Sequence, residues 1–273
     1  MPDPAQTALL ELDGVSKSFG RVVVADELSF TVGAGDIVGI VGPNGAGKTS
    51  LFGLIAGELA PSSGEIRFAG ELVTRLNAAA RCRLGIGRTF QVPRPFGNMT
   101  VFENVLVAAQ QGAGTRGRAS YGAAAQVLDR TGLAAEANSP AERLGLLQRK
   151  RLELARALAS GPRLLLLDEV AGGLTDPEVE QLVRIVASIH AEGVAIIWIE
   201  HVVRALTASV SRLICLAGGA LIGDGPPAAV LADAAVREVF LGTEVTTSLL
   251  GGSGPRARAA AGRPASESGL EDQ

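Results

Sequence analysis

The chain has 273 residues, 47% of them hydrophobic and 19% charged, so it can bury a full core as one large domain, with or without an inserted subdomain. Its net charge of −3 and aromatic content of 4% argue against a nucleic-acid partner, because they provide neither a basic surface nor stacking platforms. No run approaches 18 apolar residues, and the N-terminus lacks a signal-peptide pattern. We therefore expect a cytosolic protein that does not cross a membrane, with Cys82 and Cys215 as reduced thiols.

Antiparallel strands are predicted in the first part of the chain. Short β-prone runs between turn residues fill Leu9–Val32, and Gly64–Val73 has the pattern of a hairpin that turns at Ala69. Between them, Asp36–Val41 is an apolar run typical of a buried strand, and Ser50–Ala56 has apolar residues at helical spacing. The pattern predicts a strand, a loop and a helix, surrounded by antiparallel strands.

The loop between this strand and this helix fits the phosphate-binding pattern G-x-x-x-x-G-K-[ST]. Glycines let the backbone curl so that successive N–H groups point at phosphate oxygens, and the helix adds its positive N-terminal end. Lys48 is expected to reach the β- and γ-phosphates, and the Thr49 hydroxyl is expected to ligate Mg²⁺. The predicted nucleotide-binding residues of this segment are Gly42, Pro43, Asn44, Gly45, Ala46, Gly47, Lys48, Thr49 and Ser50.

Helical patterns dominate the middle of the chain, from Ala78 to Ser160, and are broken by Pro93 and Pro95. The short basic run Arg149–Arg151 falls within them. We interpret this run as a solvated helix face rather than as a phosphate-binding patch.

Two fully apolar runs follow, Arg163–Glu169 and Val194–Glu200, and both are typical of parallel strands covered on both faces. A helix predicted over Asp176–Glu192 joins them into a βαβ unit. After Gly242 the periodicity is lost, which predicts a disordered tail over 246–273.

Titratable residues stand at the ends of both apolar runs. Asp168 is expected to hold Mg²⁺, and Glu169 is expected to polarise the water that attacks the γ-phosphate. The carboxyl ends of neighbouring parallel strands share one crevice, so His201 is expected close to the γ-phosphate, where it holds the attacking water.

In order along the chain, the phosphate loop, Gln91, a degenerate signature at Leu144–Gln148, the two acids and His201 resemble the ATP-binding-cassette (ABC) ATPases. The resemblance covers nearly everything up to about residue 245. Four segments look closer still to the ATPase subunits of branched-chain amino-acid importers, namely Gly87–Gln91, Met99–Ala108, Ile199–His201 and Val236–Gly242.

The resemblance implies an α/β fold of the P-loop NTPase type, with a RecA-like parallel sheet core and an antiparallel β subdomain. It also implies an inserted α-helical subdomain at roughly 88–160, within a nucleotide-binding domain that spans 1–245. Two such subunits pack head to tail in the family, and each ATP is closed by the signature of the opposite subunit.

Several positions take roles from the resemblance. Phe19 matches the aromatic residue that stacks on adenine, and Gln91 matches the residue that touches Mg²⁺ and the attacking water. Gly145 and Gln148 belong to the signature that contacts the nucleotide of the other subunit. Gly173–Asp176 falls where the family has the loop that crosses between subunits.

The signature departs from the family pattern Leu-Ser-Gly-Gly-Gln. Gly145 lacks the hydroxyl of the family Ser, and Leu147 places a branched side chain where a bare backbone N–H approaches the nucleotide. Loss of one such donor costs on the order of 10²–10³ in rate. We therefore expect a second, non-identical ABC ATPase as the partner, with a homodimer as the alternative.

These observations predict an ATPase with ATP and Mg²⁺ as cofactors, bound to the inner face of the plasma membrane through integral-membrane permease subunits. Its expected task is import of branched-chain or other hydrophobic amino acids, and Val92–Met99 is expected to dock the membrane subunit. Three alternatives stay open. They are the same fold serving another cargo such as lipid or lipopolysaccharide export, a soluble cassette protein acting on DNA or ribosomes, and a weakly hydrolysing regulatory nucleotide binder.

Overall fold

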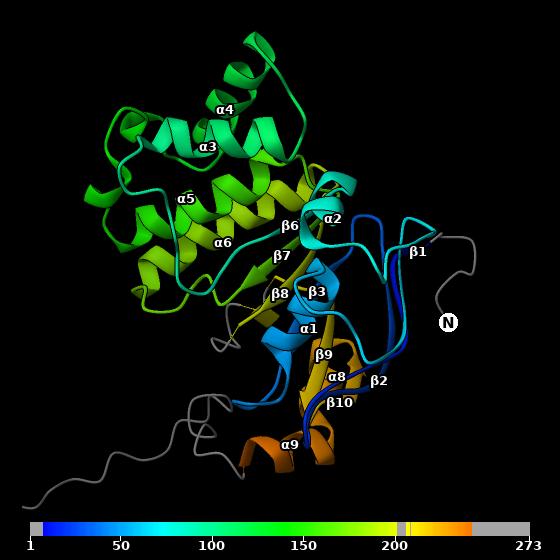
Figure 1. Ribbon diagram of the computed structural model, residues 1–273. Coiled ribbons are helices and arrows are strands. Elements are labelled where there is room, and N and C mark those ends of the chain that lie inside the picture. The colour runs from blue at the N-terminus through cyan, green and yellow to red at the C-terminus, as the bar shows by residue number, and fades with distance from the viewer. Residues whose placement is uncertain (1–7, 201–205, 208, 242–273) are drawn as a thin grey trace, which may run out of the picture.

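A computed structural model describes residues 8–200, 206–207 and 209–241 (Figure 1). His201 and the tail predicted over 246–273 lie outside the described residues. A central sheet of six strands lies between a layer of helices and a second sheet of four strands. The division into a domain at 1–245 with a helical subdomain near 88–160 stays a prediction.

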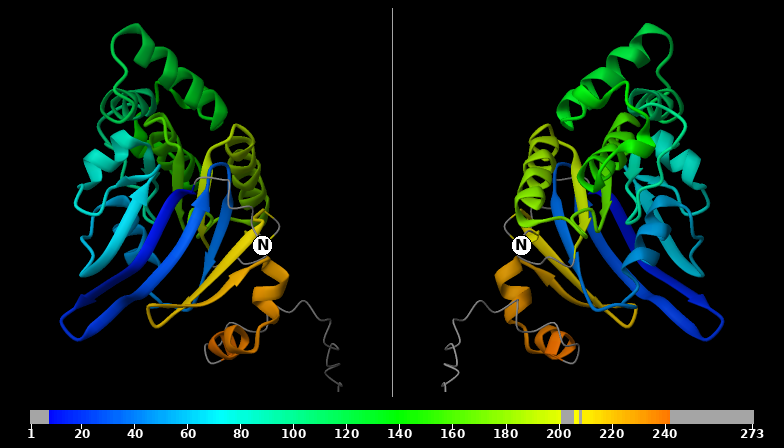
Figure 2. Two further views of the ribbon diagram at one scale, coloured as in Figure 1. Left: turned by 90° about the vertical axis from the view of Figure 1, so that its right-hand side faces the viewer. Right: turned by 90° about the vertical axis from the view of Figure 1, so that its left-hand side faces the viewer.

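The four-stranded sheet is antiparallel and has the order β2-β1-β4-β5. β1 (Ala8–Phe19) and β2 (Val22–Gly33) form a single long hairpin, which Figure 2 shows from the side. β4 (Ser63–Phe68) and β5 (Glu71–Leu72) form the predicted second hairpin, with Ala69 in a positive-φ turn conformation. The predicted antiparallel strands are confirmed, and the first two are longer than the short runs indicated.

The central sheet has the order β10-β9-β3-β8-β7-β6, and only the edge pair β9–β10 is antiparallel. The predicted βαβ unit is confirmed, because β7 and β8 are parallel neighbours joined by α6. The strands are β3 (Ile37–Val41), β6 (Ile86–Arg88), β7 (Leu164–Asp168), β8 (Ala195–Ile199), β9 (Arg212–Ala217) and β10 (Ala220–Gly225).

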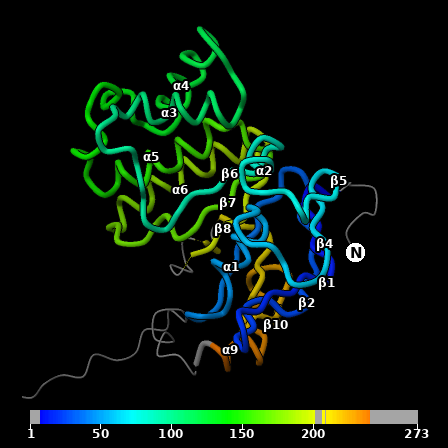
Figure 3. Tube along the Cα trace, viewed as in Figure 1, coloured from blue at the N-terminus to red at the C-terminus, as the bar shows by residue number. Residues whose placement is uncertain are grey.

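Helices α3, α4 and α5 pack on one another at one end of the molecule, as the trace in Figure 3 shows. Strand β6 interrupts the region in which helical patterns were predicted to dominate. The sequence did not indicate this strand, because three residues are too few to show a strand period. The helices are α1 (Lys48–Ala56), α2 (Ala78–Leu84), α3 (Val101–Gln111), α4 (Arg118–Arg130), α5 (Leu146–Ala159), α6 (Asp176–Ala191), α8 (Pro227–Ala232) and α9 (Ala234–Leu241).

The central sheet separates two hydrophobic cores. On β7, Leu165 and Leu167 pack with α3–α6, whereas Leu164 and Leu166 pack with α1 and the antiparallel sheet. Burial on both faces explains why this strand has no polar alternation. The arrangement fixes the carboxyl ends of β3, β7 and β8 side by side, and the predicted site residues follow these ends.

Candidate nucleotide site

The phosphate loop connects β3 to α1 and depends on glycine at two positions. Gly47 has φ +98°, and a Cβ there would lie 2.1 Å from the Val24 carbonyl oxygen. A Cβ at Gly42 would lie 2.2 Å from the Leu216 carbonyl oxygen. No larger side chain fits at either position. Because α1 begins at Lys48 with Gly47 as its N-cap, the unpaired N–H groups of its first turn face the loop.

Lys48 lies inside the curl of this loop and is 6% exposed. Its Nζ donates to the carbonyl oxygens of Gly42, at 2.8 Å, and Pro43, at 2.9 Å. Burial lowers the pKa of Lys48, while the charges of Glu169 and Asp168 oppose that shift. The loop lysine and the two acids after β7, far apart in sequence, therefore belong to one electrostatic site.

Asp168 ends β7 with 2% of its side chain exposed. Its Oδ2 accepts a hydrogen bond from Arg88 Nη2 at 3.1 Å, whereas its buried Oδ1 has no partner among the described residues. Burial raises the pKa of Asp168, and Arg88 works against that rise. A buried carboxylate oxygen without a partner is rare and fits a position that faces a cation.

That oxygen fits the predicted Mg²⁺ site, which Asp168, Thr49 and Gln91 would form. Within the described part of the chain, no three His, Cys, Asp or Glu side chains gather to hold a metal by themselves. Mg²⁺ suits such a site, because it takes few carboxylates and completes its shell with phosphate oxygens and water. When bound, Mg²⁺ neutralises the charge that develops on the phosphates.

Gln91 and Glu169 are 78 residues apart in sequence, and the fold brings their side chains together. Gln91 Nε2 donates to Glu169 Oε2 at 2.5 Å. Glu169 has φ +48°, an uncommon conformation for a residue with a side chain. The residue expected to touch Mg²⁺ and the attacking water thus contacts the carboxylate expected to polarise that water, although both roles stay predictions.

Phe19 is the last residue of β1 and is 50% exposed. The ammonium of Lys17 lies 5.0 Å from the ring centroid. The backbone of Phe19 pairs in register with Val22. The carbonyl oxygen of Val24, two residues further on, lies against Gly47 of the phosphate loop. This position beside the loop is compatible with stacking on adenine, which stays a prediction.

The signature forms the start of α5, where Gly145 is the N-cap and Gln148 lies in the first turn. Among the described residues, no hydrogen bond joins Gly145 or Gln148 to the phosphate loop of the same chain. The expectation for Leu147 is wrong, because its side chain is buried, whereas Leu146 is 47% exposed. A Cβ at Gly173 would lie 3.3 Å from Leu146. The branched side chain at the surface of the signature is therefore Leu146.

Three buried charged residues complete the site, and the sequence patterns alone gave them no role. Arg88 pairs with Asp168, and Glu200, 2% exposed, accepts hydrogen bonds from Ala171 N at 2.7 Å and Trp198 Nε1 at 3.2 Å. Burial raises the pKa of Glu200. The third is Lys150, 4% exposed, for which the interpretation as part of a solvated face is wrong. The sequence did contain a signal for its burial, because Lys150 lies at helical spacing on the apolar stripe formed by Leu147, Leu154 and Leu158.

A curled glycine loop between a buried parallel strand and a helix, with acids at the end of a neighbouring strand, defines a P-loop nucleoside triphosphatase. Residues 25–172 match the ABC transporter family, and the chain belongs to that family. It is an ATPase. Within its described residues, no helix is long and apolar enough to span a membrane.

Two curated relatives and one solved structure show how far the similarity extends. The chain is 32% identical over 249 residues to the high-affinity branched-chain amino acid transport ATP-binding protein BraF of Pseudomonas aeruginosa, covering 86% of this chain and 98% of that protein. It is 33% identical over 236 residues to the lipopolysaccharide export system ATP-binding protein LptB of Acidithiobacillus ferridurans, with the same coverage of 86% and 98%.

The solved structure is an ATP-binding cassette of an ABC transporter in its ADP conformation. It has 28% identity and a TM-score of 0.78 to this chain, and the match covers 86% of this chain and 99% of that one. The comparisons confirm the predicted family, fold class and ATPase activity.

Proposed function

We propose that the chain energises import of branched-chain or other hydrophobic amino acids through integral-membrane permease subunits. The observation that carries this proposal is the similarity to BraF, which extends over 98% of that protein and is not confined to the phosphate loop. ATP binding closes a pair of ATPase subunits and hydrolysis reopens it, so that transport follows the cycle.

An uptake assay tests the cargo. Deletion of the gene is expected to abolish uptake of radiolabelled leucine, which the native gene restores and a Lys48→Ala variant does not. Export of lipopolysaccharide is a second candidate, favoured by the similarity to LptB over 98% of its length. It predicts the opposite pattern, a more permeable outer membrane with unchanged leucine uptake.

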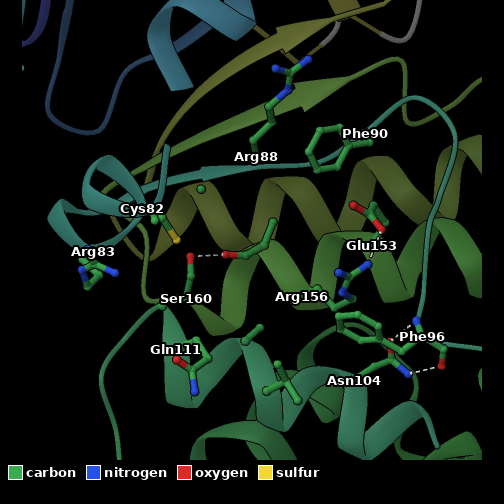
Figure 4. A pocket seen from close by; sticks show the side chains of 16 residues that line it. Cys82, Arg83, Arg88, Phe90, Phe96, Asn104, Gln111, Glu153, Arg156 and Ser160 are labelled. Carbon is green, nitrogen blue, oxygen red and sulfur yellow. Dashed lines mark hydrogen bonds and ion pairs between the residues drawn. The ribbon is translucent and has the colours of Figure 1, made fainter. Parts of the chain in front are cut away.

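A groove of about 400 Å³ beside Gln91 supports docking of a permease on this face (Figure 4). It lies between α2 and β6 on one side and α3 and α5 on the other, and its lining includes Phe90, Phe96, Glu153 and Arg156. Phe90 is 42% exposed and Phe96 is 47% exposed. Two exposed aromatic rings beside the Gln91 loop provide an apolar contact for a membrane subunit.

The predicted docking segment, Val92–Met99, is held in place by side chains of α3 and α5. The amide of Asn104 accepts from Phe96 N at 2.8 Å and donates to Phe96 O at 3.1 Å. Arg156 donates to Arg94 O at 2.8 Å, and its guanidinium lies 5.2 Å from the centroid of the Phe96 ring. A fixed backbone with an exposed ring suits docking, because little order has to be gained on binding.

Substitution of Phe96 tests the docking surface. Phe96→Ala is expected to uncouple transport while ATP binding stays intact, because the phosphate loop is untouched. Leu72→Ala is the matched control, since Leu72 is 51% exposed and lies on β5 of the antiparallel sheet. Normal transport by the Phe96→Ala variant would show that this segment is not the coupling contact.

We further propose that the partner ATPase is a non-identical chain. The degenerate signature supports this, since Gly145 offers no hydroxyl. ATP on this chain's loop would then be closed by the partner's signature, and ATP on the partner's loop would turn over slowly. Glu169→Gln in the assembled transporter is expected to remove more than half of the ATPase activity. Survival of more than half, or brisk turnover by a homodimer, contradicts the pairing.

A further inference from the structure

Lys150 is a buried cation to which none of the roles described so far belongs. It lies in α5, two residues beyond the signature residue Gln148, and is 4% exposed, whereas the adjacent Arg149 is exposed. An ammonium group is almost never fully buried unless it is paired. The contacts that Lys150 makes at its buried position therefore indicate its task.

The ammonium binds two main-chain oxygens. Lys150 Nζ donates to the carbonyl of Gln91 at 2.8 Å and to the carbonyl of Glu169 at 3.1 Å. These are the two residues whose side chains meet at 2.5 Å. The Lys150 ammonium thus binds the backbones of the same two residues whose side chains contact each other.

Four acidic side chains near Lys150 partly offset the effect of burial on its pKa. Burial lowers its pKa, and the charges of Glu200, Glu169, Asp168 and Glu153 oppose that shift. In its charged form an ammonium donates stronger hydrogen bonds than a neutral amine does.

The backbone at Glu169 needs such support. Its φ of +48° costs free energy for any residue with a Cβ, and such a conformation persists only where its surroundings fix it. The Glu169 N–H donates to Ile199 O at 2.9 Å, and the Glu169 carbonyl accepts from Gly172 N at 3.2 Å as well as from Lys150. The Lys150 side chain joins this turn to α5 and to the backbone of Gln91.

We propose that Lys150 is a positioning residue for ATP hydrolysis, because its ammonium ties α5 to the backbones of Gln91 and Glu169 and so aligns both side chains with the attacking water. The proposal rests on the ATPase activity and not on the cargo. Since α5 begins at the signature, the same cation also connects that end of the chain to its own hydrolytic residues.

Substitutions at position 150 in the assembled transporter test this role, with kcat taken as the part of the turnover that Glu169→Gln abolishes. Lys150→Met keeps the length and apolar stem but removes the donors, and kcat for ATP is expected to fall about 10²-fold, the effect of a small misplacement of catalytic groups. The dissociation constant of a fluorescent ATP analogue is expected to change less than about threefold, because Lys48 and the phosphate loop are intact. Lys150→Arg restores charged donors and is expected to stay within about tenfold of the native kcat.

Arg149→Met is the matched control, since it removes a neighbouring cation that is exposed, and it is expected to leave kcat within about twofold. Hydrogen–deuterium exchange provides a readout independent of turnover, with faster exchange expected for Lys150→Met in the peptide that contains Gly172. If Lys150→Met does not fold, Lys150→Gln is measured in the same way.

Three results would overturn the proposal. The first is a kcat for the donor-free variant within threefold of native. The second is a loss of nucleotide affinity as large as the loss of kcat, which would indicate a general structural defect. The third is a Lys150→Arg variant as slow as Lys150→Met, which would show that the charged donors are not what matters.

Discussion

Replacement of Arg88 by Met tests how far the buried carboxylate of Asp168, the predicted Mg²⁺ ligand, depends on a single buried cation. Arg88 Nη2 lies 3.1 Å from Asp168 Oδ2, and 8% and 2% of the two side chains are exposed. Removing one partner of a buried ion pair costs about 3–5 kcal/mol. Arg88 Nη1 also lies 2.8 Å from Glu58, whose side chain is 37% exposed, and a pair of this kind adds at most about 1 kcal/mol. We expect a loss of about 3 kcal/mol, since Lys48 still attracts Asp168.

The loss is expected to depend on pH. Burial already raises the pKa of Asp168, and Arg88 holds it down, so the folded-state pKa rises further when Arg88 is removed. A carboxyl whose folded pKa exceeds its unfolded pKa destabilises the fold increasingly as the pH rises through that window. The difference in stability between native protein and variant should therefore shrink as the pH is lowered from 8, because protonation of Asp168 relieves the unpaired charge.

Guanidinium unfolding in the absence of nucleotide measures this difference, with the single tryptophan, Trp198, as a fully buried fluorescent probe. Glu58→Gln is the control for the second ion pair. In an Asp168→Asn background, Arg88→Met is expected to cost less than about 1 kcal/mol, because no buried charge is left unpaired. A loss below about 1 kcal/mol in the native background, or an equal loss in both backgrounds, would refute the argument.

Two further predictions concern the phosphate loop and the cysteines. Gly47→Ala is expected to abolish binding of a fluorescent ATP analogue, because its Cβ would lie 2.1 Å from the Val24 carbonyl oxygen. Gly45 also has a positive φ but has open space around it, so Gly45→Ala is expected to retain measurable binding. Equal affinities of the two variants would contradict the steric argument. Burial raises the pKa of Cys215 to about 11, so about one Cys215 thiol in a thousand is ionised at pH 8. In the folded protein, iodoacetamide is therefore expected to alkylate the less buried Cys82 far faster than Cys215. Equal rates before unfolding would show that Cys215 is accessible.

The parts of the site that follow from local chemistry were predictable. The glycines, Lys48 and the apolar run before Asp168 each depend on a short stretch of chain, and the structure has β3, α1 and β7 where the sequence patterns predicted them. The contact between Gln91 and Glu169 depends on the order of strands in the sheet, in which β6 lies beside β7. Patterns within one segment carry no information about that order.

The buried charges were harder to predict for a related reason. A basic run on a helix is usually solvated, and only the position of Lys150 on the apolar stripe distinguished it from Arg149. Arg88 ends a three-residue strand, and its partner Asp168 lies 80 residues away. Such pairs require the tertiary fold, because the residues that neutralise each other are not neighbours in the sequence.

The backbone of Glu169 has a consequence for how such a site evolves. At φ +48° glycine has a lower conformational free energy than glutamate. The residue that best suits the fold at this position is therefore one that cannot polarise water. If Glu169 has the predicted role in hydrolysis, loss of its carboxylate would cost activity but not stability, and selection for stable folding alone would favour that loss. Retention of Glu169 therefore requires continued selection for hydrolysis at this loop, and a subunit relieved of that selection would drift toward a stable cassette that binds ATP without cleaving it.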